Sequence, residues 1–183
     1  MHIIDKVVSN FKNNKLLYIG EKITISEHMI QSAMLAEKAK CNDDIICSCL
    51  LHDYGHFIID DPDDLVKKSK DGEHESIGYE YLKKFFNKEI VEPIKYHVKA
   101  KKYLTRDVKY YQALSEASKV SLKLQGGIMN DKEAKEFENS EFFESSIKLR
   151  KFDESAKKTG LKIKSINEYK NLLFSKLIWD LTT

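Results

Sequence analysis

The chain has 183 residues, a formal net charge of +2 at pH 7, 42% hydrophobic residues and 33% charged residues. This length suits one domain that is large enough to bury a functional site, and the composition is typical of a globular protein. The small net charge and the scattered lysines exclude the strong positive electrostatic potential that attracts nucleic acid. No apolar run approaches the ~20 residues of a membrane span. We therefore expect neither a nucleic-acid partner nor a membrane partner.

The cysteine content and the first residues favour a cytoplasmic protein. The three cysteines, Cys41, Cys47 and Cys49, are odd in number. Cys47 and Cys49 would lie on different sides of a helix, so a metal-binding pair is not expected, and a reduced compartment is the simplest interpretation. The first six residues lack the basic-then-apolar pattern of a secretion signal.

Helical spacing of apolar residues dominates the chain from its start. Two prolines and seven glycines leave room for long helices, and the alternation that is typical of strands is scarce. Helices are expected, in chain order, at about 3–11, 26–39, 42–53, 73–85, 88–98, 107–124, 130 onward, 141–158 and 165–181. Loops are expected at 13–22 and 58–71. The sequence therefore predicts an all-α fold, as one domain over residues 1–183 with a helical core at about 18–158 and flanking terminal helices.

Capping and stop signals support several of these boundaries. Ser26, Asn42 and Asn130 each carry an oxygen that can accept a hydrogen bond from a first-turn N–H group. The Gln-Gly-Gly stretch at 125–127 and Gly160 are stop signals, because glycine accepts the left-handed conformation that ends helices.

Six side chains are candidate metal ligands, because imidazole and carboxylate groups together suit iron, manganese or zinc. They are His28, His52, Asp53, His74, His97 and Asp153. The His52-Asp53 pair is unusual as core packing, since it ends an apolar run that would carry two polar groups into a core. An aspartate there can bridge two ions with its two oxygens. Taken singly, each histidine could be a packed or surface histidine, and Asp153 could form a solvated salt bridge.

The order of these six residues, His…His-Asp…His…His…Asp, resembles the HD-domain superfamily, an all-α fold named for its His-Asp pair. The minimal signature of that superfamily binds one metal, and its members usually hydrolyse phosphate esters. Here His74 and His97 are added, and six ligands are enough for two metals with Asp53 as the bridge. Two-metal members include phosphodiesterases and a small set of iron oxygenases.

Four further stretches distinguish between those two classes. They are Tyr18-Ile19-Gly20-Glu21, His97-x-x-x-Lys101-x-Tyr103-Leu104, Gln125-Gly126-Gly127 and Arg150-x-x-Asp153. In this order they are similar to the HD-domain mixed-valent di-iron oxygenases that cleave carbon–phosphorus bonds, and the resemblance spans about Tyr18 to Lys158. One departure is Ile128, where we expect proline, and it should alter the loop rather than the chemistry.

The resemblance implies two irons, mixed-valent Fe(II)/Fe(III), with dioxygen as co-substrate. It assigns the first iron to His28, His52, Asp53 and Asp153, and the second to Asp53, His74 and His97. The implied reaction is oxidative cleavage of a 1-hydroxyphosphonate, nearest to members that convert 2-amino-1-hydroxyethylphosphonate to glycine and phosphate. The side group stays open, since a methylated amine or a bare hydroxymethylphosphonate would use the same metals.

A phosphonate carries up to two negative charges, so its pocket needs cations. Arg150 lies three residues before Asp153, and Lys101 lies four residues after His97. Each therefore shares a helix face with a candidate metal ligand. His56, four residues after the first histidine of the His-Asp pair, is expected to face the same way as that histidine.

Neutral donors and a loop complete the predicted substrate site. Ser118, Ser121 and Gln125 follow helical spacing and can donate hydrogen bonds. By the resemblance, Tyr18 occupies the iron until substrate displaces it, and Glu21 then meets the substrate amine.

Two other functions stay open at this point. A phosphohydrolase of the same fold would use a metal-bound water to attack phosphorus. A non-catalytic HD module would bind or sense a ligand, but its usual mark is the loss of metal ligands, and all six are present here. Iron content and a strict need for oxygen separate an oxygenase from both.

Overall fold

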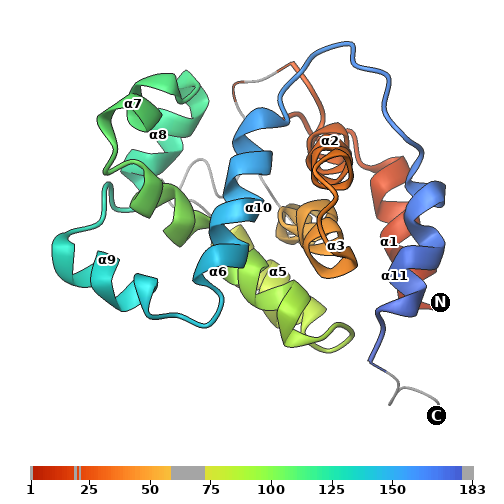
Figure 1. Ribbon diagram of the computed structural model, residues 1–183. Helices are drawn as coiled ribbons and strands as arrows, with labels where there is room; N and C mark the ends of the chain where they lie inside the picture. The colour runs from red at the N-terminus through yellow and green to blue at the C-terminus, as the bar shows by residue number, and fades with distance from the viewer. Residues whose placement is uncertain (1, 19, 21, 59–72, 179–183) are drawn as a thin grey trace.

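The computed structural model describes residues 2–18, 20, 22–58 and 73–178 (Figure 1). Its α-helices are α1 Ile3–Asn13, α2 Ile25–Lys38, α3 Asp43–Leu51, α5 His74–Leu82, α6 Lys88–Leu104, α7 Val108–Ala113, α8 Glu116–Leu124, α9 Asp131–Glu138, α10 Phe143–Ser155 and α11 Lys170–Ser175. The 3-10 helices are η1 Tyr54–Phe57 and η2 Ile166–Tyr169. These residues contain isolated β-bridges but no strand, so the predicted all-α class is confirmed.

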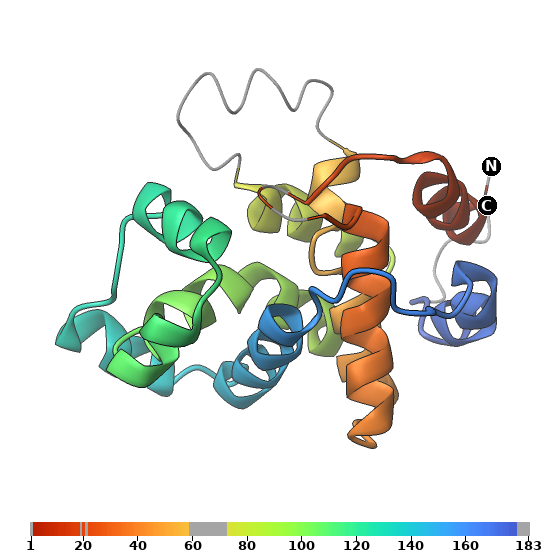
Figure 2. The same ribbon diagram turned by 90° about the horizontal axis from the view of Figure 1, so that it is seen from above.

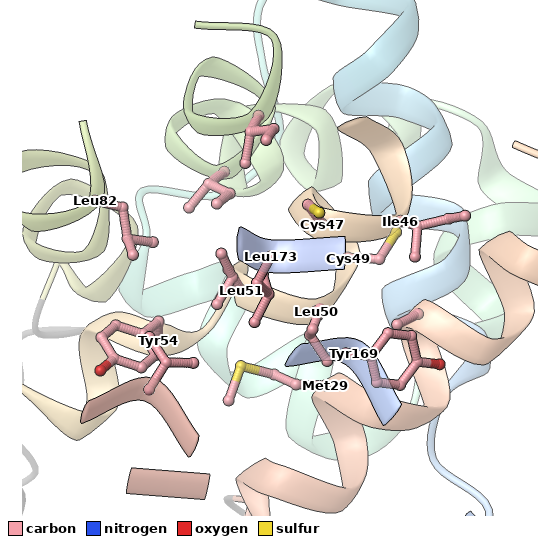
Figure 3. Packing of buried hydrophobic residues seen from close by; sticks show 14 of the residues in the cluster. Met29, Ile46, Cys47, Cys49, Leu50, Leu51, Tyr54, Leu82, Tyr169 and Leu173 are labelled. Atoms are coloured by element: carbon pink, nitrogen blue, oxygen red, sulfur yellow. The ribbon is translucent and has the colours of Figure 1, made fainter. Parts of the chain in front are cut away.

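Helix α3 is the centre of the fold, because almost its whole surface is buried. Residues 45–51 are all inaccessible to solvent or nearly so. A helix that is apolar on all sides is stable only inside a core. Helices α2, α6 and α10 contact it (Figure 1), and its side chains pack among Met29, Tyr54 and Leu82 (Figure 3). The chain leaves α3 directly into His52 and Asp53, so this polar pair also stays in the core.

The predicted caps at Asn42 and Asn130 are confirmed, and the one at Ser26 is wrong. Asn42 and Asn130 each accept a hydrogen bond from a first-turn N–H group. Helix α2 instead begins after Thr24, whose hydroxyl accepts from the Glu27 N–H group while the Glu27 carboxylate accepts from the Thr24 N–H group. This capping box stabilises the helix start. The Ser26 hydroxyl is therefore free to donate to a carbonyl of α1, which ties α1 to α2.

Two further helix boundaries differ from the prediction. The helix predicted at 88–98 continues to the end of α6, because its buried stripe continues through Ala100. The single helix predicted at 107–124 is two helices, α7 and α8. Leu114 is extended between them, with ψ at 143°, and the Ser115 hydroxyl accepts a first-turn hydrogen bond of α8. A serine cap inside an apolar pattern thus starts a new helix.

The last predicted helix, 165–181, is the 3-10 helix η2 followed by the short helix α11. Its final residues, 179–181, lie outside the described part of the chain, as does the predicted loop at 58–71 apart from Ile58. Helix α11 lies beside α1 at one side of the molecule, whereas α7, α8 and α9 lie at the other side (Figures 1 and 2). Among the described residues, no helix has the length and apolar composition needed to cross a bilayer.

A close contact between two glycines sets the position of α5. A Cβ atom on Gly55, in η1, would lie 1.9 Å from the main-chain oxygen of His74, and one on Gly78 would lie 3.1 Å from the main-chain nitrogen of Gly55. The two backbones can approach this closely only without side chains. Since His74 is the first residue of α5, the contact also fixes where that histidine lies.

We expect Gly55→Ala to lower the free energy of unfolding by about 3 kcal/mol, because the start of α5 must move away from η1. For a chain of this length the thermal midpoint should fall by roughly 6–12 °C. Gly160→Ala is the control, since Gly160 has φ +69° but open space around it, and left-handed backbone strain costs only about 1 kcal/mol. Thermal unfolding followed by circular dichroism measures both variants. A Gly55→Ala midpoint no lower than that of the control would contradict the close contact.

Candidate functional site

The six predicted metal ligands converge in the core from α2, the end of α3, the start of α5, the middle of α6 and the end of α10. None of the six is more than 6% exposed. They form two groups whose ligand atoms lie within 4.8 Å of one another. The first triplet is His28, His52 and Asp153, and the second triplet is Asp53, His74 and His97. Each triplet could hold one metal ion.

The Asp53 carboxylate lies between the two triplets. Its Oδ2 atom is 3.6 Å from Nε2 of His28 and 3.4 Å from Nε2 of His52. Its Oδ1 atom is 3.3 Å from Nε2 of His74 and 3.6 Å from Nε2 of His97. One oxygen therefore faces each triplet, which is the arrangement of a carboxylate that bridges two ions.

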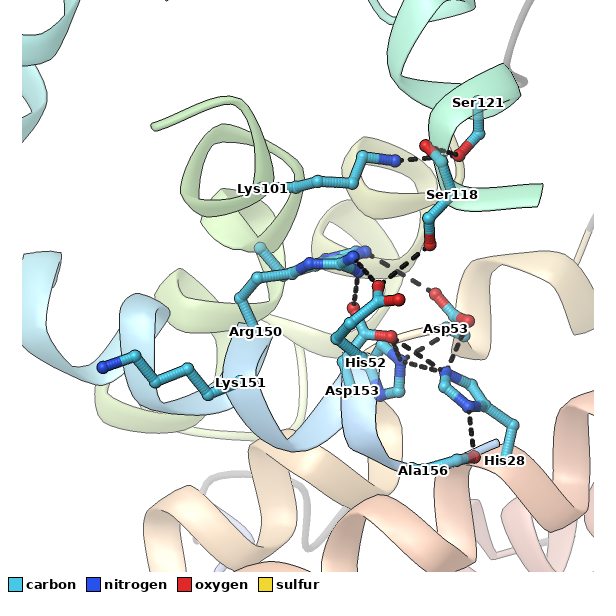
Figure 4. Close-up of polar contacts among 12 residues, drawn as sticks. His28, His52, Asp53, Lys101, Ser118, Ser121, Arg150, Lys151, Asp153 and Ala156 are labelled. Carbon is cyan, nitrogen blue, oxygen red and sulfur yellow. Dashed lines mark hydrogen bonds and ion pairs between the residues drawn. The ribbon is translucent and has the colours of Figure 1, made fainter. Parts of the chain in front are cut away.

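The main chain fixes the orientation of three of the imidazoles. Nδ1 of His28 lies 2.9 Å from the carbonyl oxygen of Ala156 (Figure 4). Nδ1 of His52 and of His97 lie 2.8 and 2.7 Å from carbonyl oxygens three residues earlier in the chain. A carbonyl oxygen only accepts, so each Nδ1 carries the proton and each Nε2 directs a lone pair at the triplets. Metal-binding histidines are usually held in this way.

The donor set fits a metal, because without a cation its lone pairs and charges face one another. The Nε2 atoms of His28 and His52 are 3.1 Å apart, and so are those of His74 and His97. Two imidazole nitrogens that each lie ~2.1 Å from one ion at a right angle would be about 3 Å apart. Oδ1 of Asp153 is buried and accepts no hydrogen bond from the residues that the structure describes. An ion in each triplet would satisfy these atoms.

The protonation states of the site also suit metal ions. Burial alone would raise the pKa of the Asp53 carboxyl, but its histidine neighbours, His52 first, hold that pKa well below its ordinary value. Burial would also raise the pKa of the Asp153 carboxyl, but Arg150 and the histidines hold that pKa well below its ordinary value. Burial, reinforced by a neighbouring imidazole, lowers the pKa of His97 to about 3. Ionised carboxylates and neutral imidazoles are the forms that bind metals.

The carboxylates of the site also act on His52. Burial, the largest single influence, would lower the pKa of His52, but Asp53, Asp153 and the Cys49 carbonyl together raise it. A metal ion bound by His52 would require its neutral form.

Arg150 lies beside the first triplet, on the same face of α10 as Asp153. It is 2% exposed, and its guanidinium donates to Oδ2 of Asp153 and to Oε2 of Glu154. Its Nε lies 3.3 Å from the hydroxyl of Tyr110 on α7. The side chain points toward the ligand cluster, whereas that of Lys151 points away from it (Figure 4). Arg150 therefore presents a buried positive charge next to a candidate metal ligand.

The predicted polar groups of α6 and α8 face one another near Arg150 (Figure 4). Lys101 is 5% exposed, and its Nζ donates to the Ser121 hydroxyl at 2.9 Å. Ser118, one turn earlier on α8, is buried and donates to a Glu154 oxygen at 2.9 Å. Gln125 is half-buried at the C-terminal cap of the same helix. These elements bring a cation and two hydroxyls to one side of the ligand cluster.

The loop before α2 reaches the first triplet through Tyr18. The centroid of its ring lies 4.3 Å from that of His28. Gly20 has φ +74°, and a Cβ atom there would lie 2.8 Å from the Cβ atom of Ala117, so the loop also touches α8. Glu21, the predicted partner of the substrate amine, lies outside the described residues.

His56 does not continue the helical face of His52, because α3 ends at Leu51 and η1 follows. Its ring instead stacks on that of His74, with centroids 4.3 Å apart and an interplanar angle of 17°. His56 therefore borders the second triplet, and the expectation that it shares a face with His52 is wrong.

Sequence reasoning missed the roles of two further charged residues. The Glu154 carboxylate accepts hydrogen bonds from Arg150 and Ser118, and the Lys157 Nζ lies 2.7 Å from the Ser118 hydroxyl. Arg150, Glu154 and Lys157 are spaced i, i+4 and i+7 in the predicted helix 141–158, although α10 ends at Ser155 and leaves Lys157 just beyond it. That spacing was the available signal.

This chain is similar to known proteins over most of its length. The HD-domain model matches residues 25–125. Hydroxymethylphosphonate dioxygenase of Gimesia maris is 40% identical over 154 residues, which make up 83% of this chain and 77% of that protein. A 1-hydroxy-2-(trimethylamino)ethylphosphonate dioxygenase (glycine-betaine-forming) of Leisingera caerulea is 41% identical over 145 residues, or 79% and 74%. An uncharacterized protein of Acanthamoeba polyphaga mimivirus is 42% identical over 164 residues, or 87% and 74%.

We expect Asp53→Ala to abolish the binding of both metals, because its two oxygens face both triplets. His97→Ala should mainly remove the metal of the second triplet, since it leaves every donor of the first in place. Elemental analysis of the purified variants measures metal per chain, and His2→Ala, a change at an exposed histidine, is the control. Equal metal retention in Asp53→Ala and His97→Ala would refute the bridging assignment.

Proposed function

This chain belongs to the HD-domain phosphonate dioxygenases, and from that premise we propose that it uses dioxygen to cleave the carbon–phosphorus bond of a 1-hydroxyphosphonate. The observation that carries the proposal is the Asp53 carboxylate between two buried triplets, with the buried guanidinium of Arg150 beside them. A small dianion can contact metal ions and a guanidinium together in such a site.

The proposed reaction balances without an external reductant. The carbon that bears the hydroxyl loses its hydrogen and its bond to phosphorus, and it becomes a carboxylate. Phosphorus leaves as inorganic phosphate. Both atoms of one dioxygen molecule end in these two products. A phosphohydrolase would instead exchange a phosphorus–oxygen bond with water and would need no oxygen.

We propose two irons, mixed-valent Fe(II)/Fe(III), as the resident metals. Imidazole and carboxylate donors suit iron, manganese or zinc, and membership of an oxygenase family favours iron. The first triplet with Asp53 would supply four donors, and the second would supply three. When bound, the ions would provide redox chemistry toward dioxygen and Lewis acidity toward the hydroxyl and phosphonate oxygens.

The protein side chains bind and orient the phosphonate in this proposal. Arg150 and Lys101 are both at least 95% buried, so their positive charges act in a medium of low dielectric constant. Arg150 is already hydrogen-bonded on several sides, so little rotamer freedom is lost on binding. Ser121 adds a neutral donor, and Ser118, whose hydroxyl proton is donated to Glu154, completes the predicted substrate site with Gln125 and His56.

For the side group we propose an amine, which makes 2-amino-1-hydroxyethylphosphonate the substrate and glycine the carboxylate product. The support is the Tyr18–Glu21 stretch, whose first residue lies against His28. Tyr18 would cover the first triplet until substrate binds, and Glu21 would pair with the ammonium. The two named relatives differ from each other in this side group, by the substrates in their names.

We expect the iron-loaded protein to release phosphate from 2-amino-1-hydroxyethylphosphonate in air and not under argon. Oxygen consumption and phosphate release should be equal, as measured with an oxygen electrode and a colorimetric phosphate assay. Hydroxymethylphosphonate, 1-hydroxyethylphosphonate and the trimethylated analogue should have lower kcat/KM. Phosphate release that needs no oxygen would overturn the oxygenase. A higher kcat/KM for a substrate without a primary amine would overturn only the side group.

We expect Lys101→Met to raise KM about tenfold or more with metal content unchanged, because it removes a charge-assisted hydrogen bond worth roughly 1.5–3 kcal/mol. Lys151→Met is the matched control, since Lys151 is an exposed lysine that points away from the cluster. Steady-state kinetics on the hydroxyphosphonate that the wild type uses best measure the effect. If both variants keep the wild-type KM, Lys101 does not bind the phosphonate.

A further inference from the structure

The Glu154 carboxylate lies where α10 meets the start of α8, and it accepts hydrogen bonds from both helices. It accepts from the Arg150 guanidinium of α10 and, at 3.2 Å, from the Nζ of Lys157, which lies two residues after the end of that helix. On the α8 side it accepts from the Ser118 hydroxyl at 2.9 Å and from the Ser115 N–H group at 3.3 Å. Its side chain is only 15% exposed. One carboxylate thus holds four donors together.

Lys157 contacts the same serines that Glu154 contacts. Its Nζ donates to the hydroxyls of Ser118 and Ser115 at 2.7 and 3.1 Å, in addition to Glu154. It also lies 5.4 Å from the centroid of the Tyr18 ring, and the lysine side chain is 9% exposed. Lys157 therefore connects the loop before α2, the end of α10 and the start of α8.

Helix α8 depends on such polar contacts, because it has few apolar ones. Within this helix only Ser118 and Leu122 are buried, and α7 has no buried residue. Val120 and Leu124 of α8 are more than half exposed. The hydrogen bonds to Glu154 and Lys157 are thus among the contacts that fix the position of Ser118.

The Glu154 carboxylate also fixes the orientation of the Arg150 guanidinium. One amino group of the guanidinium donates to Asp153 and the other to Glu154. Without the Glu154 charge, both amino groups are free to pair with Asp153, whose carboxylate belongs to the first triplet. The guanidinium would then turn away from α8, and a buried cation would lose half of its charge compensation.

We propose that Glu154 and Lys157 are a positioning pair that holds Arg150 and the start of α8 in the geometry that binds the phosphonate. The inference rests on the proposed function for the identity of the anion. Glu154 acts through Arg150 and Ser118, and Lys157 balances its charge and fixes it to α8. Neither residue is a metal ligand, so their loss should weaken anion binding while the metals stay bound.

The test measures binding of inorganic phosphate and of methylphosphonate to the metal-loaded protein by isothermal titration calorimetry. Methylphosphonate has no hydroxyl group, so it reports binding without the oxidation. Glu154→Gln keeps the size of the side chain but removes its charge, and Glu144→Gln is the control at an exposed glutamate of the same helix. Lys157→Met is paired with Lys151→Met in the same way. Metal per chain and the thermal midpoint are measured for all four variants.

We expect Glu154→Gln and Lys157→Met each to raise the dissociation constant of both anions by about tenfold, as for loss of a charge-assisted contact. Metal content should change little, and the controls should match the wild type. The thermal midpoint of Glu154→Gln should fall, because the buried guanidinium loses part of its charge compensation. Glu154→Asp should recover part of the affinity, because it restores the charge. The double variant should be no weaker than the more affected single variant, since the two residues act as one unit.

Unchanged anion affinity in both single variants would overturn the proposal. So would a loss of bound metal that accompanies the loss of affinity, because that outcome indicates that the pair only supports the metal site. If Glu154→Gln does not fold, Lys157→Met decides the question alone. The proposed function fails separately: a wild type that binds both anions but oxidises no hydroxyphosphonate would refute the oxygenase and leave the positioning pair intact.

Discussion

The burial of six ionisable side chains in an apolar core is the constraint on which the rest of this structure depends. Carboxylates and imidazoles are costly to bury unless they are compensated. Here the compensation comes from Arg150, from main-chain carbonyls and, in our proposal, from two metal ions. Helix α3 makes this burial possible, because it is apolar on all sides and ends directly at His52 and Asp53. Helices α2, α5, α6 and α10 each bring one further candidate ligand to that end.

The sequence was sufficient where a local pattern determines the outcome. The apolar run before His52-Asp53 predicted that the pair would be buried, and spacing along one helix predicted that Arg150 would lie beside Asp153. The all-α class followed from the helical period and the scarcity of alternation. The split at Leu114 was missed because its signal, a serine cap, lies inside a continuous apolar pattern. The predicted cap at Ser26 was wrong because Thr24 and Glu27 form a capping box that starts the helix two residues earlier.

Contacts between distant parts of the chain could not be predicted from local patterns, and the six ligands were grouped only through the family resemblance. His74 reaches the second triplet because Gly55 and Gly78 let η1 touch α5, and no local pattern reports that contact. The hydrogen bond between Glu154 and Ser118 joins two helices that are far apart in sequence. The sequence therefore indicated only that Glu154 lies near Arg150 on the same helix. The extent of the single domain and the roles of the site residues stay predictions, which the metal and substrate experiments address.

The hydrogen bonds from Nδ1 of three histidines to main-chain carbonyls have a consequence for how such a protein can diverge. A carbonyl oxygen is supplied by whatever residue occupies the position, so amino-acid replacement at Ala156, Cys49 or Ile94 does not by itself remove the acceptor. Substitutions of the residues that supply these carbonyls therefore leave the orientation of the imidazoles unchanged. The groups beside the triplets, in contrast, are all side chains, and each can be exchanged singly. Such a framework can acquire new substrates by small steps while its ligand geometry persists.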